Sequence, residues 1–355
     1  MDLSLFFLPT WREGYGQTLT QYYEEIAESV KLADRLGWKR ALTTEHHFHY
    51  YGGAVPNPAV LLAAWARETS QIRLAPAVSL MQLRDPLKVA EDYALVDQLS
   101  NGRVDMGVAK GFVPHEFSAF HVDPAEVPAR IAEGLSICQK FWRGEPFAHS
   151  GTFFTFDKLQ PWPPAVNGGL PIWNAASHTR ESFVNAASRG YHLMMNHYPM
   201  NAASLEEKFG WYCDSWEKSG HKTSDRKAMV AFMTHLADTE EQAIEEAKAA
   251  LQEHAGAYGK VLRGKQWDTD YEGDISILLQ MCENEDWRDV FRRRTLICTP
   301  QQAAERIQKY LDLGFTEISF IARYAGLTHD QTMTTVTRIS DEVLPMLGLK
   351  ADAAE

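Results

Sequence analysis

Short apolar runs alternate with longer amphipathic segments along most of this chain, and this alternation is the strongest constraint on its fold. Eight of the runs have the length and the side-chain types of buried strands. They are residues 3–7, 40–44, 73–80, 104–108, 171–176, 193–196, 228–236 and 317–321. Eight strands alternating with helices are typical of a parallel (β/α)8 barrel, or TIM barrel. A doubly wound α/β sheet is the alternative, but no G-x-G-x-x-G motif follows a strand.

Helix-like segments with one apolar face separate most of these runs. They are residues 22–36, 57–68, 86–99, 130–142, 180–188, 240–254 and 300–313. Residues 255–298 lack a clean period, and long irregular insertions in barrels usually form lids or surface loops. We therefore expect a single α/β barrel domain over residues 1–350, with an inserted mobile loop near its C-terminal mouth. Residues 351–355 are expected to form a disordered tail.

The composition of the chain argues against some classes of binding partner and indicates where the protein is located. The chain has 47 acidic and 35 basic residues, a formal charge of −12, which argues against general nucleic-acid binding and against docking on anionic membranes. Its four cysteines are scattered without a C-x-x-C pair, so no metal site is predicted. With no signal-like start and no run long enough to span a bilayer, this cysteine usage predicts a cytoplasmic protein.

The segment Glu45-His46-His47-Phe48 carries the clearest signal for chemistry. It follows the second strand-like run, and α/β barrels keep their active sites at the C-terminal ends of the strands. Imidazole is the side chain best suited to proton transfer near neutral pH, so the pair of histidines suggests acid–base work. The alternative is a pair of ordinary loop histidines, one packed and one solvated.

Further motifs follow this segment in a recognisable order. They are residues 55–58, 85–92, 97–103, 104–111, Arg130 with Glu133, 171–177, 286–289 and 298–300. Taken together they resemble the bacterial luciferase-like family of flavin-dependent monooxygenases, and in particular its luciferase α subunits (alkanal monooxygenases). The similarity extends over most of the chain rather than over one motif.

The resemblance implies a barrel that binds FMN at its C-terminal mouth under a mobile loop. It implies that FMNH2 comes from a separate NAD(P)H:flavin reductase and reacts with O2 to give a flavin C4a-hydroperoxide. That species would oxygenate an apolar or carbonyl-bearing small molecule. Family barrels commonly pair through helices near the early strands, so a homodimer through residues 57–68 and 86–99 is expected.

The resemblance also assigns roles to individual residues. His46 aligns with the catalytic acid/base of the family, His47 is its neighbour, and Glu45 is placed to orient an imidazole or to form an ion pair at the barrel rim. The flavin phosphate needs cations and backbone donors. The predicted phosphate-binding residues are Lys110, Arg130, Ser177, His178 and Thr179, and Ala176 beside them is expected in the cofactor site. Lys110 stands where luciferases carry an arginine, and both it and Arg130 have surface charges as their alternative interpretation.

The remaining predicted site residues concern the flavin ring and the substrate. Ala77 and Val78 lie in the third strand-like run, where the family has an unusual peptide geometry beside the flavin. Ala109 stands where luciferase has a reactive cysteine. The expected substrate pocket consists of Phe112, Trp173, His197 and Tyr198. Ordinary core or rim packing is the alternative for each of these residues.

Three other functions compete with this interpretation. The first is a deazaflavin (F420)-dependent oxidoreductase of the same superfamily, which transfers hydride without oxygen. The second is a flavin-binding protein without catalysis, and the third is a non-catalytic β subunit of a heterodimer. The retained histidine pair speaks against the second and the third. The sequence does not identify the substrate.

Overall fold

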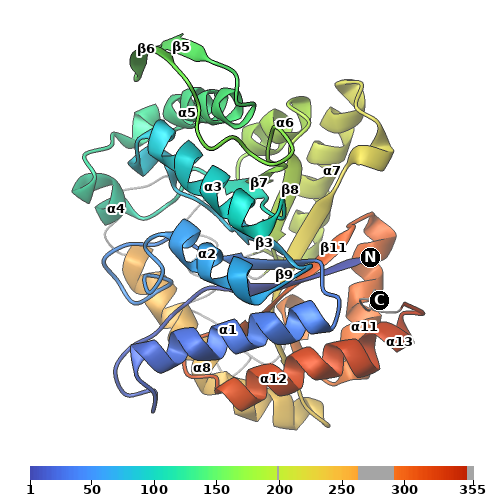
Figure 1. Ribbon diagram of the computed structural model, residues 1–355. Coiled ribbons are helices and arrows are strands. Elements are labelled where there is room, and N and C mark those ends of the chain that lie inside the picture. The colour runs from blue at the N-terminus through green and yellow to red at the C-terminus, as the bar shows by residue number, and fades with distance from the viewer. Residues whose placement is uncertain (198–199, 263–291, 350–355) are drawn as a thin grey trace.

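Eight parallel strands lie side by side in the computed structural model of this chain (Figure 1), in the order β3-β2-β1-β11-β9-β8-β7-β4. Their bounds are β1 Asp2–Phe7, β2 Arg40–Thr43, β3 Arg73–Pro76, β4 Met106–Val108, β7 Ile172–Ala175, β8 His192–Asn196, β9 Ala228–Leu236 and β11 Glu317–Arg323. Bridges between Leu74 and Val104 and between Ser79 and Val108 join the two ends of this row, which nearly closes the sheet into a barrel. Each strand overlaps one predicted run, so the predicted (β/α)8 fold is confirmed.

Helices cover the outside of the barrel (Figure 1). The structure describes residues 1–197, 200–262 and 292–349. Within them the α-helices are α1 Leu19–Arg35, α2 Pro58–Glu68, α3 Pro86–Ser100, α4 Pro114–Ala119, α5 Val127–Trp142, α6 Arg180–Ser188, α7 Ala202–Lys218, α8 Glu240–Leu262, α11 Pro300–Leu313, α12 His329–Arg338 and α13 Leu344–Met346. Short 3-10 turns are Met81–Leu83, Pro124–Glu126 and Thr223–Asp225, and Ile339–Val343 is a π-helical turn. Capping boxes at Thr18, Thr299 and Thr328 start three of the helices.

Three strands lie outside the repeating pattern of the barrel. β5 (Phe147–Ser150) and β6 (Thr155–Leu159) form an antiparallel hairpin beside α5 (Figure 1). β10 (Leu296–Cys298) pairs in parallel with β9. The predicted bounds of the inserted loop were therefore too wide, because residues 255–262 continue α8 and residues 296–298 form β10. Residues 263–291 of the predicted loop and the predicted tail lie outside the described part of the chain.

Successive side chains along a strand belong alternately to two apolar clusters, because they point to opposite faces of the sheet. In β9, Val230 and Phe232 belong to the cluster shared with the outer helices, including Tyr22 and Trp65. Met229, Ala231 and Met233 belong to a second cluster, which includes Phe6, Leu42 and Trp173 of other strands and continues into α8. Both faces of the strands are thus buried, which explains their continuous apolar runs.

Charged side chains meet in the floor of the barrel, at the first residues of the strands. Arg40 of β2 bonds both to Asp105, at 2.7 Å from Nε, and to Glu317 of β11, and it is only 2% exposed. Arg73 bonds to the same Asp105 carboxylate at 2.6 Å, and the Arg40 guanidinium lies 4.5 Å from the Trp173 ring centre. Burial alone would lower the pKa of Arg40, but Glu317 and Asp105 raise it. The floor is therefore a charged, balanced cluster.

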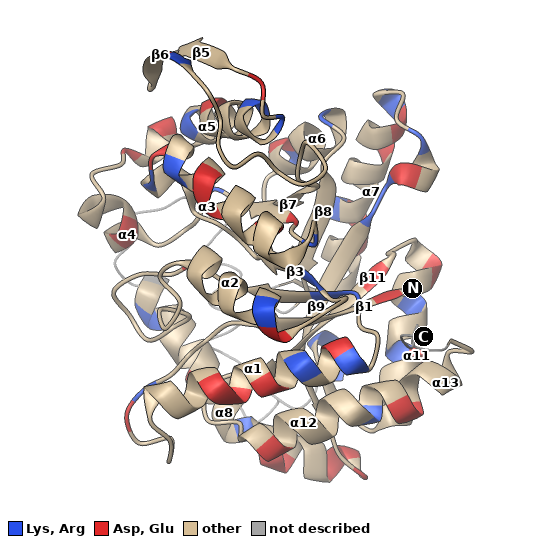
Figure 2. Cartoon of the chain, in the orientation of Figure 1, with Lys and Arg blue, Asp and Glu red and all other residues tan. Residues whose placement is uncertain are grey.

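No helix in the described ranges is long and apolar enough to cross a membrane. On α1, the first half carries acidic side chains, and both basic side chains lie in the second half (Figure 2).

Candidate active site

The segment Glu45-His46-His47 begins two residues after β2 ends, so it lies at the C-terminal mouth of the barrel. All three side chains are buried. The backbone turns at Phe48, whose φ of 65° is in the left-handed region, and the Phe48 side chain is exposed. The mouth is where barrels place their chemistry, and the structure brings the predicted catalytic residues to it.

His46 is held from several sides. Its Nδ1 lies 3.1 Å from Oε1 of Glu116 on α4, and its ring lies 5.4 Å from the Tyr51 ring and 5.5 Å from the Phe112 ring. Gly52 has φ +68° and approaches the ring so closely that a Cβ atom there would lie 2.6 Å from His46 Cδ2. Nε2 makes no hydrogen bond to any described residue. It is therefore the ring nitrogen open to proton transfer.

Glu116 joins three groups of the histidine segment through one oxygen. Its Oε1 lies 3.1 Å from His46 Nδ1 and 3.3 Å from His49 Nε2, and accepts the backbone N–H of His47 at 2.8 Å. Burial alone would raise the pKa of this carboxyl, but hydrogen bonds from His46, His49 and the His47 backbone lower it to about 2. Glu116 is thus an ionised carboxylate at neutral pH although it is 1% exposed.

Sequence reasoning missed both Glu116 and His49. His49 lies two residues beyond the motif, in a segment with several aromatic residues. Glu116 lies eight residues after β4, in a helix too short for a periodic pattern to reveal. The available signal was topological, because a carboxylate that follows one barrel strand can reach a histidine that follows another.

Glu45 connects two strand ends rather than orienting His46. Its Oε2 accepts the Leu80 N–H at 3.0 Å and the Ser79 hydroxyl at 3.1 Å, while Oε1 lies 3.3 Å from His47 Nε2. Leu80 and Ser79 follow β3, directly after the peptide bond between Ala77 and Val78, which is cis. Glu45 therefore fixes His47 and the end of β3 together. Ala77 and Val78 themselves are partly buried and pack against the second apolar cluster.

Only some of the predicted phosphate-binding residues lie close to one another. Thr179 is the N-cap of α6 but does not cap it with its side chain, and its hydroxyl lies 2.8 Å from that of Ser182. Ser177 and His178 are half-buried and Ala176 is buried in the turn before α6. The Lys208 ammonium donates to the Ser177 carbonyl at 2.9 Å, which adds positive charge beside the turn. A helix N-terminus with this charge favours an anion.

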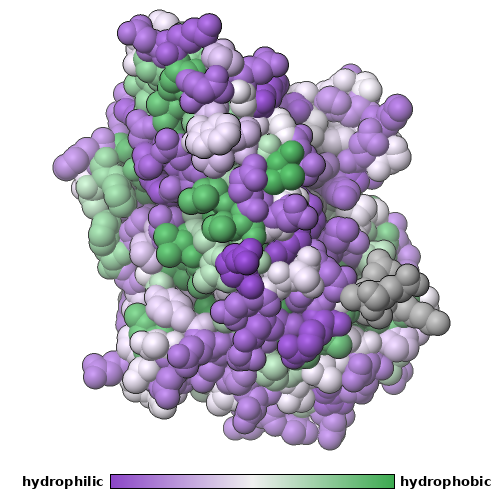
Figure 3. Space-filling model, viewed as in Figure 1, coloured by the Kyte–Doolittle hydropathy of each residue, from purple (hydrophilic) through white to green (hydrophobic). Residues whose placement is uncertain are grey.

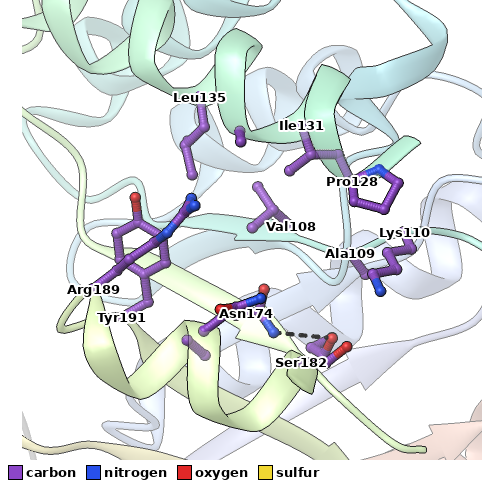
Figure 4. A pocket seen from close by; sticks show the side chains of 14 residues that line it. Val108, Ala109, Lys110, Pro128, Ile131, Leu135, Asn174, Ser182, Arg189 and Tyr191 are labelled. Atoms are coloured by element: carbon purple, nitrogen blue, oxygen red, sulfur yellow. Dashed lines mark hydrogen bonds between the residues drawn. The ribbon is translucent and has the colours of Figure 1, made fainter. Parts of the chain in front are cut away.

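A cavity of about 90 Å³ lies between α5, α6 and the ends of β4 and β7 (Figure 4). Ala109 and Lys110 line it together with Asn174 and Ser182, so it opens beside the first turn of α6. Lys110 is exposed and pairs with none of the described carboxylates. An unpaired ammonium at this position could meet an anionic group.

Arg130 does not join this cavity. Its Nε lies 2.9 Å from Oε2 of Glu126, and its guanidinium lies 4.5 Å from the Phe153 ring centre on the β5–β6 hairpin. Glu133 of the same motif accepts the backbone N–H groups of Thr152 and Phe154 at 3.0 and 2.9 Å, and thereby holds that hairpin on α5. The structure thus uses both motif residues to attach the hairpin.

The predicted substrate residues lie in three different places. Phe112 lies at the mouth beside His46. Trp173 is in the barrel floor over Arg40, because it is only the second residue of β7. His197 faces the outer helices: its Nδ1 lies 3.1 Å from the Arg294 carbonyl and its Nε2 lies 2.5 Å from the Tyr310 hydroxyl of α11. Trp173 and His197 therefore do not form a pocket with Phe112, and Tyr198 lies outside the described residues.

The burial of His197 gives a pH-dependent stability. Burial lowers the pKa of His197 to about 4, from an ordinary value of 6.5. Between these two values the unfolded chain binds a proton that the folded chain does not, so stability falls as the pH drops from about 6.5 to about 4. We expect wild type to lose about 2 kcal/mol more than a His197→Gln variant between pH 7 and pH 5.

Urea unfolding at the two pH values measures this difference. Glutamine keeps one donor and one acceptor for the Arg294 carbonyl and the Tyr310 hydroxyl but does not titrate. Other buried histidines, such as His254, are the same in both proteins, so their contribution cancels. Equal losses in the two proteins would contradict the assignment.

Comparisons with known proteins agree with this geometry. The model of the luciferase-like monooxygenase family matches residues 1–317. The oxygenase component of the flavin-dependent trigonelline monooxygenase of Acinetobacter baylyi is 26% identical over 338 residues, which is 93% of this chain and 91% of that protein.

Two solved structures share the fold. The oxygenating constituent of the 3,6-diketocamphane monooxygenase of Pseudomonas putida, a type II Baeyer–Villiger enzyme in complex with FMN, aligns with a TM-score of 0.80 at 22% identity over 99% of both chains. An F420-dependent secondary alcohol dehydrogenase aligns with a TM-score of 0.72 at 16% identity over 98% of both chains. With a family match that covers most of its length and a barrel that carries the histidine motif at its mouth, this chain belongs to the luciferase-like monooxygenases.

Proposed function

We propose that this protein is the oxygenase of a two-component system. It would take FMNH2 from a separate NAD(P)H:flavin reductase and use O2 to oxygenate an apolar or carbonyl-bearing small molecule. The observation that carries the proposal is the match along nearly the whole chain to a relative named as the oxygenase component of a flavin-dependent monooxygenase. The buried His46, with one ring nitrogen open at the barrel mouth, supports it.

The residues at the mouth suit FMN. Lys110, the uncapped first turn of α6 and the Ser177 and Thr179 hydroxyls form a donor set suited to a phosphate dianion. Ala77 and Val78 follow β3 with small, partly buried apolar side chains, against which a flat ring would pack. Bound FMNH2 would supply the reaction with oxygen. His46 would hold or deliver a proton at Nε2, and Phe112 would form part of an apolar wall for the substrate.

The oxygenation reaction can be tested with a panel of compounds while the natural substrate is still unidentified. The protein would be supplied with a flavin reductase, NADH, FMN and isotopically labelled O2, and offered trigonelline, an aldehyde and a cyclic ketone. We expect labelled oxygen in the product of at least one compound, and only with FMN present. Oxidation of an alcohol with F420 and without incorporation of oxygen would instead favour the deazaflavin-dependent oxidoreductase.

Replacing His46 separates catalysis from binding. We expect His46→Gln to slow turnover by roughly 100-fold, the usual contribution of a general acid or base. Flavin binding should stay within a few-fold of wild type, because the proposed phosphate donors are Lys110 and the first turn of α6 rather than His46. Steady-state rates and flavin fluorescence titrations measure the two quantities. An equal loss of both would mean that His46 serves the structure of the mouth.

Replacing Lys110 tests the phosphate end of the site. We expect Lys110→Met to weaken FMN binding by about 10-fold, the order of one hydrogen bond to a charged group, and to leave riboflavin binding unchanged because riboflavin has no phosphate. Lys140→Met on the outer part of α5 is the matched control, since Lys140 is also exposed but does not line the cavity. Equal weakening of FMN and riboflavin would place the phosphate elsewhere.

We also propose a homodimer. Val60 of α2 and Leu95 of α3 are 68% and 52% exposed, and apolar side chains gather over these two neighbouring helices (Figure 3). An exposed apolar patch on adjacent helices favours self-association. Light scattering should then give twice the chain mass, and Leu95→Lys should shift it toward the monomer; a monomeric wild type would contradict the proposal.

A further inference from the structure

The carboxylate of Glu116 is the strongest feature of the mouth that the proposed function does not yet use. One of its oxygens faces two imidazoles and a backbone N–H, all in the segment that follows β2. The closest titratable neighbours of the carboxylate are thus His46 and His49. Ring contacts add Tyr51, which lies against His46 and His49, and His115, which lies against His49.

The position of the Glu116 carboxylate determines the tautomer of His46. An ionised carboxylate only accepts hydrogen bonds, so the nitrogen that faces it must carry a hydrogen. At His46 this nitrogen is Nδ1, at 3.1 Å from Glu116 Oε1. A neutral His46 therefore has its lone pair on Nε2, the nitrogen with no hydrogen bond to the described residues. The same logic protonates His49 at Nε2, and its Nδ1 is buried without a partner among the described residues.

We propose that Glu116 is a positioning residue that fixes His46 as its Nδ1–H tautomer, with Nε2 free to accept a proton, and stabilises the imidazolium once the proton has moved. This inference rests on the proposed function of His46 as acid and base. A buried carboxylate that orients a catalytic imidazole through its far nitrogen is a general device for proton transfer. His49 and the His47 backbone keep the carboxylate in place through the same oxygen.

The low pKa of Glu116, about 2, is consistent with this role because the group stays ionised through the working pH range of any ordinary enzyme. Gly52 lies on another side of the ring, where the absence of a side chain leaves room for the imidazole: a Cβ atom at this position would lie 2.6 Å from His46 Cδ2. Half a turn of the ring about its Cβ–Cγ bond would break the contact of Nδ1 with Glu116 and place Nδ1 where Cδ2 now lies, close to Gly52.

Two substitutions separate the acceptor from the charge. Glu116→Gln keeps an oxygen acceptor of the same reach and removes the charge, whereas Glu116→Leu removes both. We expect turnover to fall by about 10-fold or more in Glu116→Gln and further in Glu116→Leu. KM for the substrate and the flavin affinity should change by less than about 3-fold, because Glu116 is 1% exposed and its carboxylate bonds to the histidine segment.

The control is a carboxylate of the same kind away from the mouth. Glu133 also bonds an imidazole, His149 at 3.1 Å, and backbone N–H groups, but it holds the β5–β6 hairpin. Glu133→Gln should therefore leave turnover within about 2-fold of wild type. A similar loss in Glu133→Gln and Glu116→Gln would mean that Glu116 acts only through stability.

Nitrogen NMR of isotope-labelled imidazoles gives a readout that needs no flavin or substrate. In the free wild-type protein we expect His46 to show a protonated Nδ1 and a bare Nε2, and in Glu116→Leu a mixture of both tautomers or the reverse one. An unchanged His46 tautomer in Glu116→Leu would overturn the proposal. If oxygenation itself is not found but the tautomer changes as expected, the proposed function fails and the positioning role stands.

Discussion

The pairing of Arg40 with Asp105 and Glu317 is the interaction on which the rest of the barrel depends. It joins β2, β11 and the residue before β4, and all three side chains are at most 2% exposed. Burying these groups separately would be very costly, whereas the paired cluster is tolerated, so the strands can come together only in the register that brings the partners into contact. Arg73 and the ring of Trp173 complete the cluster. With the floor fixed, the opposite ends of the strands meet at the mouth.

The buried carboxylates of the floor and of the mouth have different partners. In the floor, arginines that stay protonated balance Asp105 and Glu317. At the mouth, the buried carboxylates of Glu45 and Glu116 face histidines. An imidazole can gain or lose a proton near neutral pH, so the charge balance of the mouth can change during a reaction while that of the floor cannot. The groups suited to proton transfer thus lie at one end of the strands, and the arginine cluster lies at the other.

The barrel strands and the position of the histidine segment could be predicted from the sequence. The eight strand runs are apolar because both faces of each strand are buried, and the Glu45-His46-His47 segment was placed at the mouth because it ends one of these runs. Because both faces of the strands are apolar, the sequence does not show whether a side chain points into the barrel or toward the outer helices. His197 directly follows β8 but its ring stacks 5.1 Å from Phe232, on the helix side. Trp173 was expected near the substrate, but its place early in β7 puts it in the floor.

Long-range contacts account for most of what the sequence did not reveal. Nothing near Glu116 in the chain indicates His46, which is 70 residues away. Arg130 and Glu133 match a motif of the luciferase-like family, but in this structure they attach the β5–β6 hairpin to α5. The sequence did not predict this hairpin, because β5 and β6 have only half-buried and exposed residues and therefore no apolar run. Helices α7 and α12 were also missed; α12 is rich in threonine, and its capping box at Thr328 was the remaining signal.

We propose that this barrel binds reduced flavin and controls its reaction with oxygen. The most direct measurement is rapid mixing of the protein–FMNH2 complex with O2 while the visible absorbance of oxidised flavin is followed. We expect a clear delay before oxidised flavin appears, compared with free FMNH2 under the same conditions, and a shorter delay when a compound that the protein oxygenates is present. Oxidised flavin that forms with the time course of free FMNH2 would contradict it.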